Sequence, residues 1–108
     1  MTGVQTCALP IFQVAGFYAL DCKRNSAELL HLWVLPEAMR RGVGRSLFLH
    51  AIERAKSAGC VEITIESDPN AEGFYLKLGA IRTGSVIYEA EPRRELPMLV
   101  YAIRDQPR

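Results

Sequence analysis

The stretch that decides the fold runs from Trp33 to Phe48 and reads WVLPEAMRRGVGRSLF. An apolar, β-prone run ends at Pro36, a short basic loop follows, and two glycines separated by one residue precede an amphipathic helix. Free backbone N–H groups point outward at a helix start, and the helix dipole favours negative charge there. The glycines let a bulky phosphate approach closely. The stretch therefore predicts an anion site that suits a phosphate-bearing cofactor.

A second informative segment spans residues 70–80 and reads NAEGFYLKLGA. In order and spacing, the two segments resemble the signature motifs of the Gcn5-related N-acetyltransferase (GNAT) superfamily. That family reads roughly V-x-P-x-x-R/Q-x-x-G-x-G/A in the first motif and N-x-x-A-x-x-F/L-Y-x-x-x-G-F in the second. The resemblance covers about residues 12–104. It implies an enzyme that transfers the acetyl group of acetyl-CoA to an amine.

The chain departs from the family pattern at a few positions. Met39 stands where the family usually has Arg or Gln, and Arg40 stands where Gly is common. Arg40 and Arg41 are expected to supply the missing charge, so we expect cofactor binding to survive. Gly73 and Ala80 replace commoner, larger residues, and these two changes concern packing more than chemistry.

The resemblance implies two kinds of cofactor contact. Backbone N–H groups of the glycine loop would bind the pyrophosphate of coenzyme A, which agrees with the anion site, although two glycines also suit a plain tight turn. The strand before Pro36 would splay from the next parallel strand, bind the pantetheine arm like an added strand and orient the thioester carbonyl. Two of the expected contact residues have an alternative role: Asn70 could cap a helix N-terminus, and Trp33 could pack in the core. The expected cofactor-binding residues are Leu32, Trp33, Val34, Arg40, Arg41, Gly42, Val43, Gly44, Arg45, Ser46, Asn70 and Tyr75.

Tyr75 and Glu28 are the expected catalytic residues. Tyr75 matches the family position where a tyrosine hydroxyl protonates the departing thiolate, and its alternative is a core stripe with Phe74 and Leu78. The incoming amine must lose a proton, which Glu28 or His31 would accept. These two residues have opposite parity, so an unbroken strand cannot aim both into one cleft.

The first residues depart from the family pattern altogether. Residues 2–11 read TGVQTCALPI and resemble the translated reading frame of a widely used sequencing adapter. We therefore expect a non-native segment over residues 1–11 and a truncated GNAT domain, its cofactor-binding portion, over residues 12–108. A genuine short N-terminal strand is the alternative. Truncation would remove much of the acceptor-binding wall, leave the strand over residues 12–20 as an exposed edge, and favour self-association, for example as a homodimer.

The expected fold is a mixed α/β layer of order ββαβαββ, a GNAT-like fold without its N-terminal strand and helices. The most secure element is the helix after Gly42, because apolar residues recur on one face between Leu47 and Ala55. The strand–helix–strand unit over residues 27–67 needs a right-handed crossover and parallel pairing. The remaining expected elements are strands over 12–20, 80–88 and 96–103 and a short helix from the 68–70 turn to Leu78.

Composition narrows the class of protein further. The 108 residues are 49% hydrophobic and carry a formal net charge of +1, so no global field attracts nucleic acid or a membrane. An odd count of three cysteines, Cys7, Cys22 and Cys60, argues against a disulfide framework or a zinc site and for a reducing compartment. No apolar run approaches the roughly 18 residues of a membrane span. We expect a soluble cytoplasmic protein without a metal.

Direct attack of the amine in a ternary complex is the mechanism that the family resemblance implies. It needs no covalent enzyme intermediate, so Cys22 and Cys60 are not expected nucleophiles. The acceptor stays open between a small-molecule and a peptide amine, and the truncated chain is expected to bind acetyl-CoA poorly and catalyse little. The alternative is a non-catalytic acyl-CoA-binding module, which would keep the glycine loop without depending on Tyr75.

Overall fold

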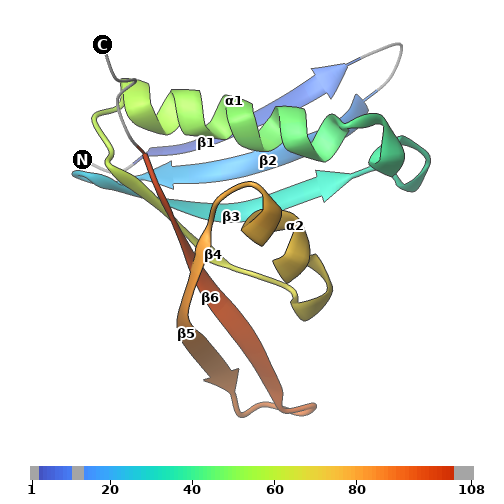
Figure 1. The fold of residues 1–108 in the computed structure, drawn as a ribbon, viewed down its shortest axis with the longest axis vertical. Helices are drawn as coiled ribbons and strands as arrows, with labels where there is room; N and C mark the ends of the chain where they lie inside the picture. The colour runs from blue at the N-terminus through green and yellow to red at the C-terminus, as the bar shows by residue number, and fades with distance from the viewer. Residues whose placement is uncertain (1–2, 11–13, 104–108) are drawn as a thin grey trace.

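One six-stranded sheet, in the order β1-β2-β3-β4-β6-β5, organises the computed structural model, which describes residues 3–10 and 14–103 (Figure 1). Within this part of the chain, β3 and β4 pair parallel and the other neighbouring strands pair antiparallel. The strands are β1 (Gly3–Pro10), β2 (Val14–Cys22), β3 (Ser26–Val34), β4 (Glu62–Glu66), β5 (Ile81–Tyr88) and β6 (Arg94–Ala102). The helices are α1 (Val43–Ser57) and α2 (Glu72–Lys77), with 3-10 turns η1 (Pro36–Arg41) and η2 (Pro69–Ala71) before them.

The expected mixed α/β fold is confirmed, and one strand is added in front of the predicted order. β1 pairs with β2 over residues 3–10, so β2 has a neighbour on each side and β1 is the edge. The expectation that the strand over residues 12–20 would be an exposed edge is therefore wrong; its residues 12 and 13 lie outside the described part. The non-native origin of residues 1–11 stays a prediction, as does self-association, which now concerns the β1 edge.

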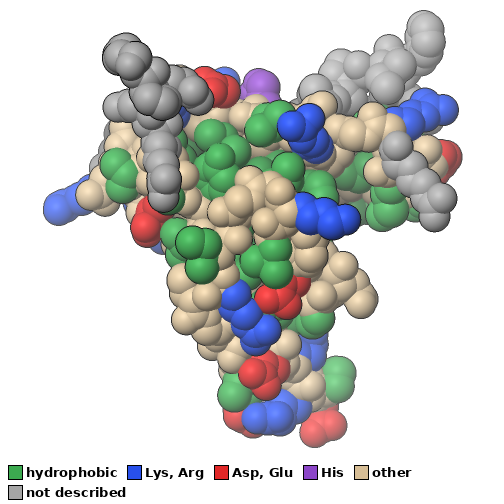
Figure 2. Space-filling model, in the orientation of Figure 1, with side chains coloured by type: hydrophobic (Ala, Val, Ile, Leu, Met, Phe, Trp, Pro, Cys, Tyr) green, Lys and Arg blue, Asp and Glu red, His purple; other side chains and the backbone are tan. Residues whose placement is uncertain are grey.

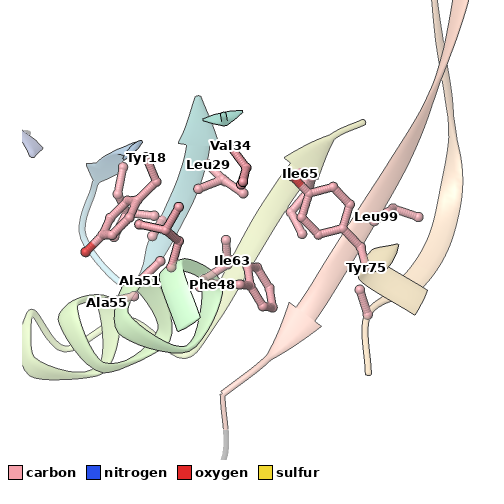
Figure 3. Close-up of a cluster of buried hydrophobic side chains, with 14 of the residues drawn as sticks. Tyr18, Leu29, Val34, Phe48, Ala51, Ala55, Ile63, Ile65, Tyr75 and Leu99 are labelled. Carbon is pink, nitrogen blue, oxygen red and sulfur yellow. The ribbon is translucent and has the colours of Figure 1, made fainter. Parts of the chain in front are cut away.

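Helix α1 lies across the β1–β2–β3 half of the sheet and buries the face that the periodicity predicts (Figure 1). Leu47, Phe48 and Ala51 are almost fully buried, and Ile52 at the margin of the face is half-buried. Figure 3 shows this face meeting core side chains of β2, β3 and β4. In the described residues, no helix is long and apolar enough to cross a membrane.

Gly16 in β2 permits this close approach of α1 to the sheet. A Cβ atom there would lie 2.7 Å from the carbonyl oxygen of Trp33 and 2.9 Å from Cδ1 of Leu47. Both distances are shorter than a van der Waals contact, so a larger residue must push α1 or β3 away. The glycine thus sets the spacing between the helix and the strands that carry the site.

A β-bulge interrupts β3 at Leu30. Ala19 of β2 pairs with His31 and the next residue, Leu20, pairs with Leu29, so Leu30 is skipped. The buried positions change at the bulge: an odd-numbered residue, Leu29, is buried before it, and an even-numbered residue, Val34, is buried after it. The expectation that Glu28 and His31 have opposite parity is therefore wrong for this strand, because it is not unbroken. Both residues lie on the sheet face turned away from α1.

Candidate functional site

The two motifs of the sequence meet around one pocket of about 360 Å³. It lies between the end of β3, the start of α1, and the η2–α2 segment, in the part of the molecule where Figure 1 shows α2 beside β3 and β4. Segments that are about 30 residues apart in the chain thus share one cavity, as two sequence motifs do when both serve one ligand. The pocket is lined by Leu32, Val34, Met39, Gly42, Gly44, Arg45, Asn70, Ala71, Phe74 and Tyr75.

The first wall of the pocket is a strand end that has left its neighbour. Parallel pairing between β3 and β4 ends at Leu29 and Ile65, while β3 continues to Val34. Over residues 30–34 the described part of β4 therefore supplies no ladder partner, and Leu32 and Val34 line the pocket there. The expected splay is present. Unpaired backbone groups of a strand are a template for an extended ligand.

The second wall is the glycine loop at the start of α1. Gly42 has a φ of 78°, which favours glycine, and its carbonyl accepts the first helical hydrogen bond from Ser46 N at 3.0 Å. The N–H groups of Val43, Gly44 and Arg45 precede this donor and point along the helix start. They lie at the border of the pocket, at the place where the sequence predicts an anion site.

Gly44 joins the two motifs directly. A Cβ atom at this position would lie 3.3 Å from two ring carbons of Phe74 and 3.5 Å from Cγ2 of Val34. The bare backbone of Gly44 is therefore tightly enclosed by β3 on one side and α2 on the other. A side chain at this position would fill the space between Val34 and Phe74, which forms a cradle around Gly44.

Basic charge accompanies the loop. Arg45 lines the pocket, Arg41 and Ser46 are exposed beside it, and the side chain of Arg40 lies outside the described part. Figure 2 shows Lys and Arg side chains next to hydrophobic ones over the region between α1 and α2. A mixed apolar and basic surface suits a ligand that carries both a phosphate group and an apolar arm.

Tyr75 is buried at the inner end of the pocket, with 6% of its surface exposed. Its ring packs edge-on against Phe48 at 5.6 Å and against Phe74 at 5.1 Å, and it points from α2 toward Ile65 of β4 (Figure 3). Burial raises the pKa of its hydroxyl to about 12. The hydroxyl therefore keeps its proton at neutral pH. Tyr75 is thus a core residue, as the packing alternative expects, and it also lines the pocket; its catalytic role stays a prediction.

Asn70 lines the pocket, but it is not a helix N-cap. The capping side chain is that of Asp68, whose Oδ1 accepts a hydrogen bond from Asn70 N at 2.8 Å. The alternative role considered for Asn70 is therefore wrong. Asp68 instead positions the backbone that carries Asn70 into the pocket.

Trp33, Glu28 and His31 lie on the other side of β3. Trp33 is 44% exposed and packs on Phe17 at 5.8 Å, so it is neither core nor pocket lining. With His31 and Leu32, these two rings line an open hollow of about 450 Å³. Leu32 borders both cavities. Glu28 lines neither of them, and its carboxylate lies 3.7 Å from Nζ of Lys23.

Sequence reasoning missed three lining residues of the pocket: Met39, Ala71 and Phe74. Phe74 and Ala71 belong to the second motif, and their closeness to Gly44 depends on how α2 docks against α1. Met39 was considered only as a departure from the family pattern. The structure places it at the pocket with 63% of its surface exposed.

Comparisons with known proteins agree with the fold described above. The model of the acetyltransferase (GNAT) domain family matches residues 8–99. Among solved structures, an acetyltransferase from Bacillus cereus superposes with a TM-score of 0.82 at 19% identity, covering 94% of this chain and 74% of that one. The ribosomal-protein-S18-alanine N-acetyltransferase from Escherichia coli superposes with 0.78 at 20% identity, covering 96% and 72%.

A third similar structure was solved with a ligand. It is an aminoglycoside 6'-N-acetyltransferase complexed with coenzyme A, with a TM-score of 0.82, 16% identity, and coverage of 97% of this chain and 76% of that one. At these identities the likeness to solved structures shows the fold. No curated protein sequence matches the chain.

Proposed function

Because the chain belongs to the acetyltransferase (GNAT) domain family, whose members use acetyl-CoA, we propose that it is an N-acetyltransferase that acts by direct attack of a primary amine in a ternary complex. The observation that carries the proposal is the pocket in which the splayed end of β3, the glycine loop and Tyr75 meet. The acceptor we propose is a small-molecule or peptide amine, and the place of action is the cytoplasm.

The residues around the pocket fit coenzyme A by their chemistry. The cradle at Gly44, which a Cβ atom would fill, leaves the N–H groups of Val43, Gly44 and Arg45 approachable for the pyrophosphate. Arg41 and Arg45, together with Arg40 of the same loop, add positive charge. The unpaired backbone beyond Leu29 would hold the pantetheine arm, with Asn70 facing it from η2. When bound, acetyl-CoA supplies the acetyl group as a thioester.

Tyr75 is proposed to be the proton donor. A thiolate leaves when an amine attacks a thioester, and a nearby hydroxyl that still holds its proton lowers the cost of that charge. With a pKa of about 12, the Tyr75 hydroxyl is protonated throughout the neutral range. Its rigid ring contacts keep the hydroxyl at one place in the pocket.

Glu28 is proposed to be the general base that accepts a proton from the incoming amine through water. It lies on the face of β3 that also carries His31, since the bulge at Leu30 brings the two onto one face. Its ion pair with Lys23 is half-exposed, so water reaches the carboxylate. An amine that approaches from this face would meet the thioester across the splayed strand.

Calorimetric titration of acetyl-CoA into the chain and into Gly44→Glu tests the proposal. The glutamate side chain would collide with Phe74 and place a negative charge where the pyrophosphate binds, so we expect at least about a tenfold loss of affinity. Gly84→Glu is the matched control, because it adds the same charge on β5 where a Cβ atom meets nothing within 4 Å.

Weak but measurable binding by the parent chain and by Gly84→Glu, with at least about tenfold weaker binding by Gly44→Glu, is the expected result. Equal binding by all three proteins would overturn the assignment of the glycine loop. No binding by any of them, with circular dichroism showing that each is folded, would overturn the cofactor assignment for this chain.

A further inference from the structure

Two buried thiols meet at the end of the sheet opposite to the pocket. Cys22 is the last residue of β2 and is 8% exposed, and Cys60 lies between α1 and β4 and is 4% exposed. Both are free cysteines of the same hydrophobic core, and the Cys60 sulfur lies 3.7 Å from the carbonyl oxygen of Lys23, the residue that follows Cys22. The acetyl-transfer mechanism uses neither of them.

Backbone contacts hold the two segments in this arrangement. The Cys60 thiol donates to the carbonyl oxygen of Lys23 at 3.7 Å, and Val61 N donates to the carbonyl oxygen of Asn25 at 2.8 Å. Lys23 N donates to the carbonyl oxygen of Ser26 at 2.9 Å and closes the turn between β2 and β3. Because the turn and the start of β4 are joined by these hydrogen bonds, the two segments that carry the thiols stay side by side in the folded chain.

We propose that Cys22 and Cys60 are a disulfide-forming pair, oxidised within one chain by a small oxidant of the peroxide class. The Cys22 sulfur attacks the peroxide O–O bond and becomes a sulfenic acid, and one water leaves. The Cys60 sulfur then attacks the Cys22 sulfur, the S–S bond forms, and the hydroxyl group leaves as a second water. Two thiols are oxidised and one peroxide is reduced to two waters, which take up both thiol protons.

Burial decides which oxidant reaches the pair and how fast. Because Cys22 and Cys60 are only 8% and 4% exposed, we expect a small oxidant such as hydrogen peroxide to react with them in preference to a bulky disulfide reagent. Burial, together with the neighbouring thiol, raises the pKa of Cys60, so little thiolate is present at neutral pH. The reaction is therefore slower than that of an exposed thiol.

The cross-link would tie the β2–β3 turn to the start of β4 without touching the pocket. Pocket-lining residues of β3 are Leu32 and Val34, whereas the thiols lie beside the Ser26 end of that strand. Closing a loop of roughly 40 residues restricts the unfolded chain, so we expect the Tm to rise by about 10 °C. Affinity for acetyl-CoA should stay unchanged.

The test uses the full chain with Cys7→Ser, which leaves Cys22 and Cys60 as its thiols. The protein is treated with hydrogen peroxide, unfolded and alkylated, digested, and mapped by mass spectrometry, and its Tm is recorded before and after reduction. We expect two thiols to be lost, a peptide that links Cys22 to Cys60, a monomeric product, and a Tm gain that dithiothreitol reverses. Adding Cys60→Ala should abolish both the linked peptide and the Tm gain.

Three results would overturn the proposal. They are two thiols that still alkylate after peroxide treatment, sulfinic acid on each cysteine without a link, or a covalent dimer as the main product. Peptide mapping needs no substitution in the core, so the outcome does not depend on whether Cys60→Ala folds.

Discussion

The hydroxyl group of Tyr75 is the group whose removal distinguishes the proposed catalysis from acyl-CoA binding alone. Its ring is a core side chain that Phe48 and Phe74 hold from two sides, and its oxygen is the polar part of a residue at the pocket. A phenylalanine preserves the ring packing and removes the proton that, in the proposed mechanism, the leaving sulfur takes up. The residue therefore distinguishes the proposed enzyme from a non-catalytic acyl-CoA-binding module.

Tyr75→Phe is expected to lower kcat by about 100-fold and to leave the Kd for acetyl-CoA nearly unchanged, since general acids contribute about 10²–10⁴ in rate. Release of the coenzyme A thiol in the presence of a panel of primary amines measures the rate, and calorimetry measures the Kd. Tyr101→Phe is the control, because Tyr101 packs on Phe48 at 5.4 Å without lining the pocket. Equal rates for Tyr75→Phe and the parent chain would refute the role of the hydroxyl.

At the scale of elements, the contact between α1 and β2 sets the position of the glycine loop. α1 begins at the pocket and runs over Gly16, so a displacement of the helix moves its first turn as well. Tight packing transmits such a shift because a close-packed core has few voids into which side chains could move. The stability of this one layer contact therefore bears on the site.

Gly16→Ala is expected to destabilise the chain by roughly 1–3 kcal/mol, because the added methyl group collides with the Trp33 carbonyl, a backbone atom that cannot rotate away. Urea unfolding followed by circular dichroism measures this loss. Gly73→Ala is the control: nothing lies within 4 Å of its Cβ position in α2, and alanine favours a helix. A Gly16→Ala variant as stable as the parent would show that α1 does not need the close approach.

At the scale of the whole molecule, the buried Tyr75 hydroxyl links global stability to pH. Its pKa is raised from 10.0 to about 12 in the fold by burial, so the folded state holds a proton that the unfolded chain loses first. This contribution to stability is complete below pH 10 and is lost as the pH rises from 10 to 12. The free energy of unfolding should fall there by roughly 1.4 kcal/mol per pH unit from this group.

Urea unfolding between pH 9 and about 11.5, compared for the parent chain and Tyr75→Phe, checks this linkage. The parent should lose stability more steeply than the variant above pH 10. The comparison also cancels Tyr88, an exposed tyrosine whose pKa is raised by its hydrogen bond to Glu66 and which both proteins retain. Parallel pH profiles would contradict the assignment.

Local features of the sequence were predicted well because their causes are local. The buried face of α1 follows from the spacing between Leu47 and Ala55, and the helix begins directly after Gly42, as the glycine loop predicts. The two motifs identified the family, and the family implied the splay of β3. Each of these inferences depends on residues that are close together in the sequence, or on the family resemblance that such residues carry.

The predictions that failed depend on hydrogen bonding between strands or on which of two neighbours makes a contact. In an unbroken strand, Glu28 and His31 would lie on opposite faces of the sheet. The bulge at Leu30 places both of them on the same face. The cap of η2 is Asp68 rather than Asn70. An edge strand was expected at residues 12–20, and pairing with β1 covers it.

Fold class, family and the residues of the glycine loop could be read from the amino-acid sequence, because periodicity, turn chemistry and motif spacing are properties of short segments. The packing of the folded chain was needed to show that Gly44 lies against Phe74, that Tyr75 is buried at the pocket, and that Cys60 lies against the turn after Cys22. Such contacts join residues far apart in the chain. Their distances follow from how strands register and helices pack, which no single segment encodes.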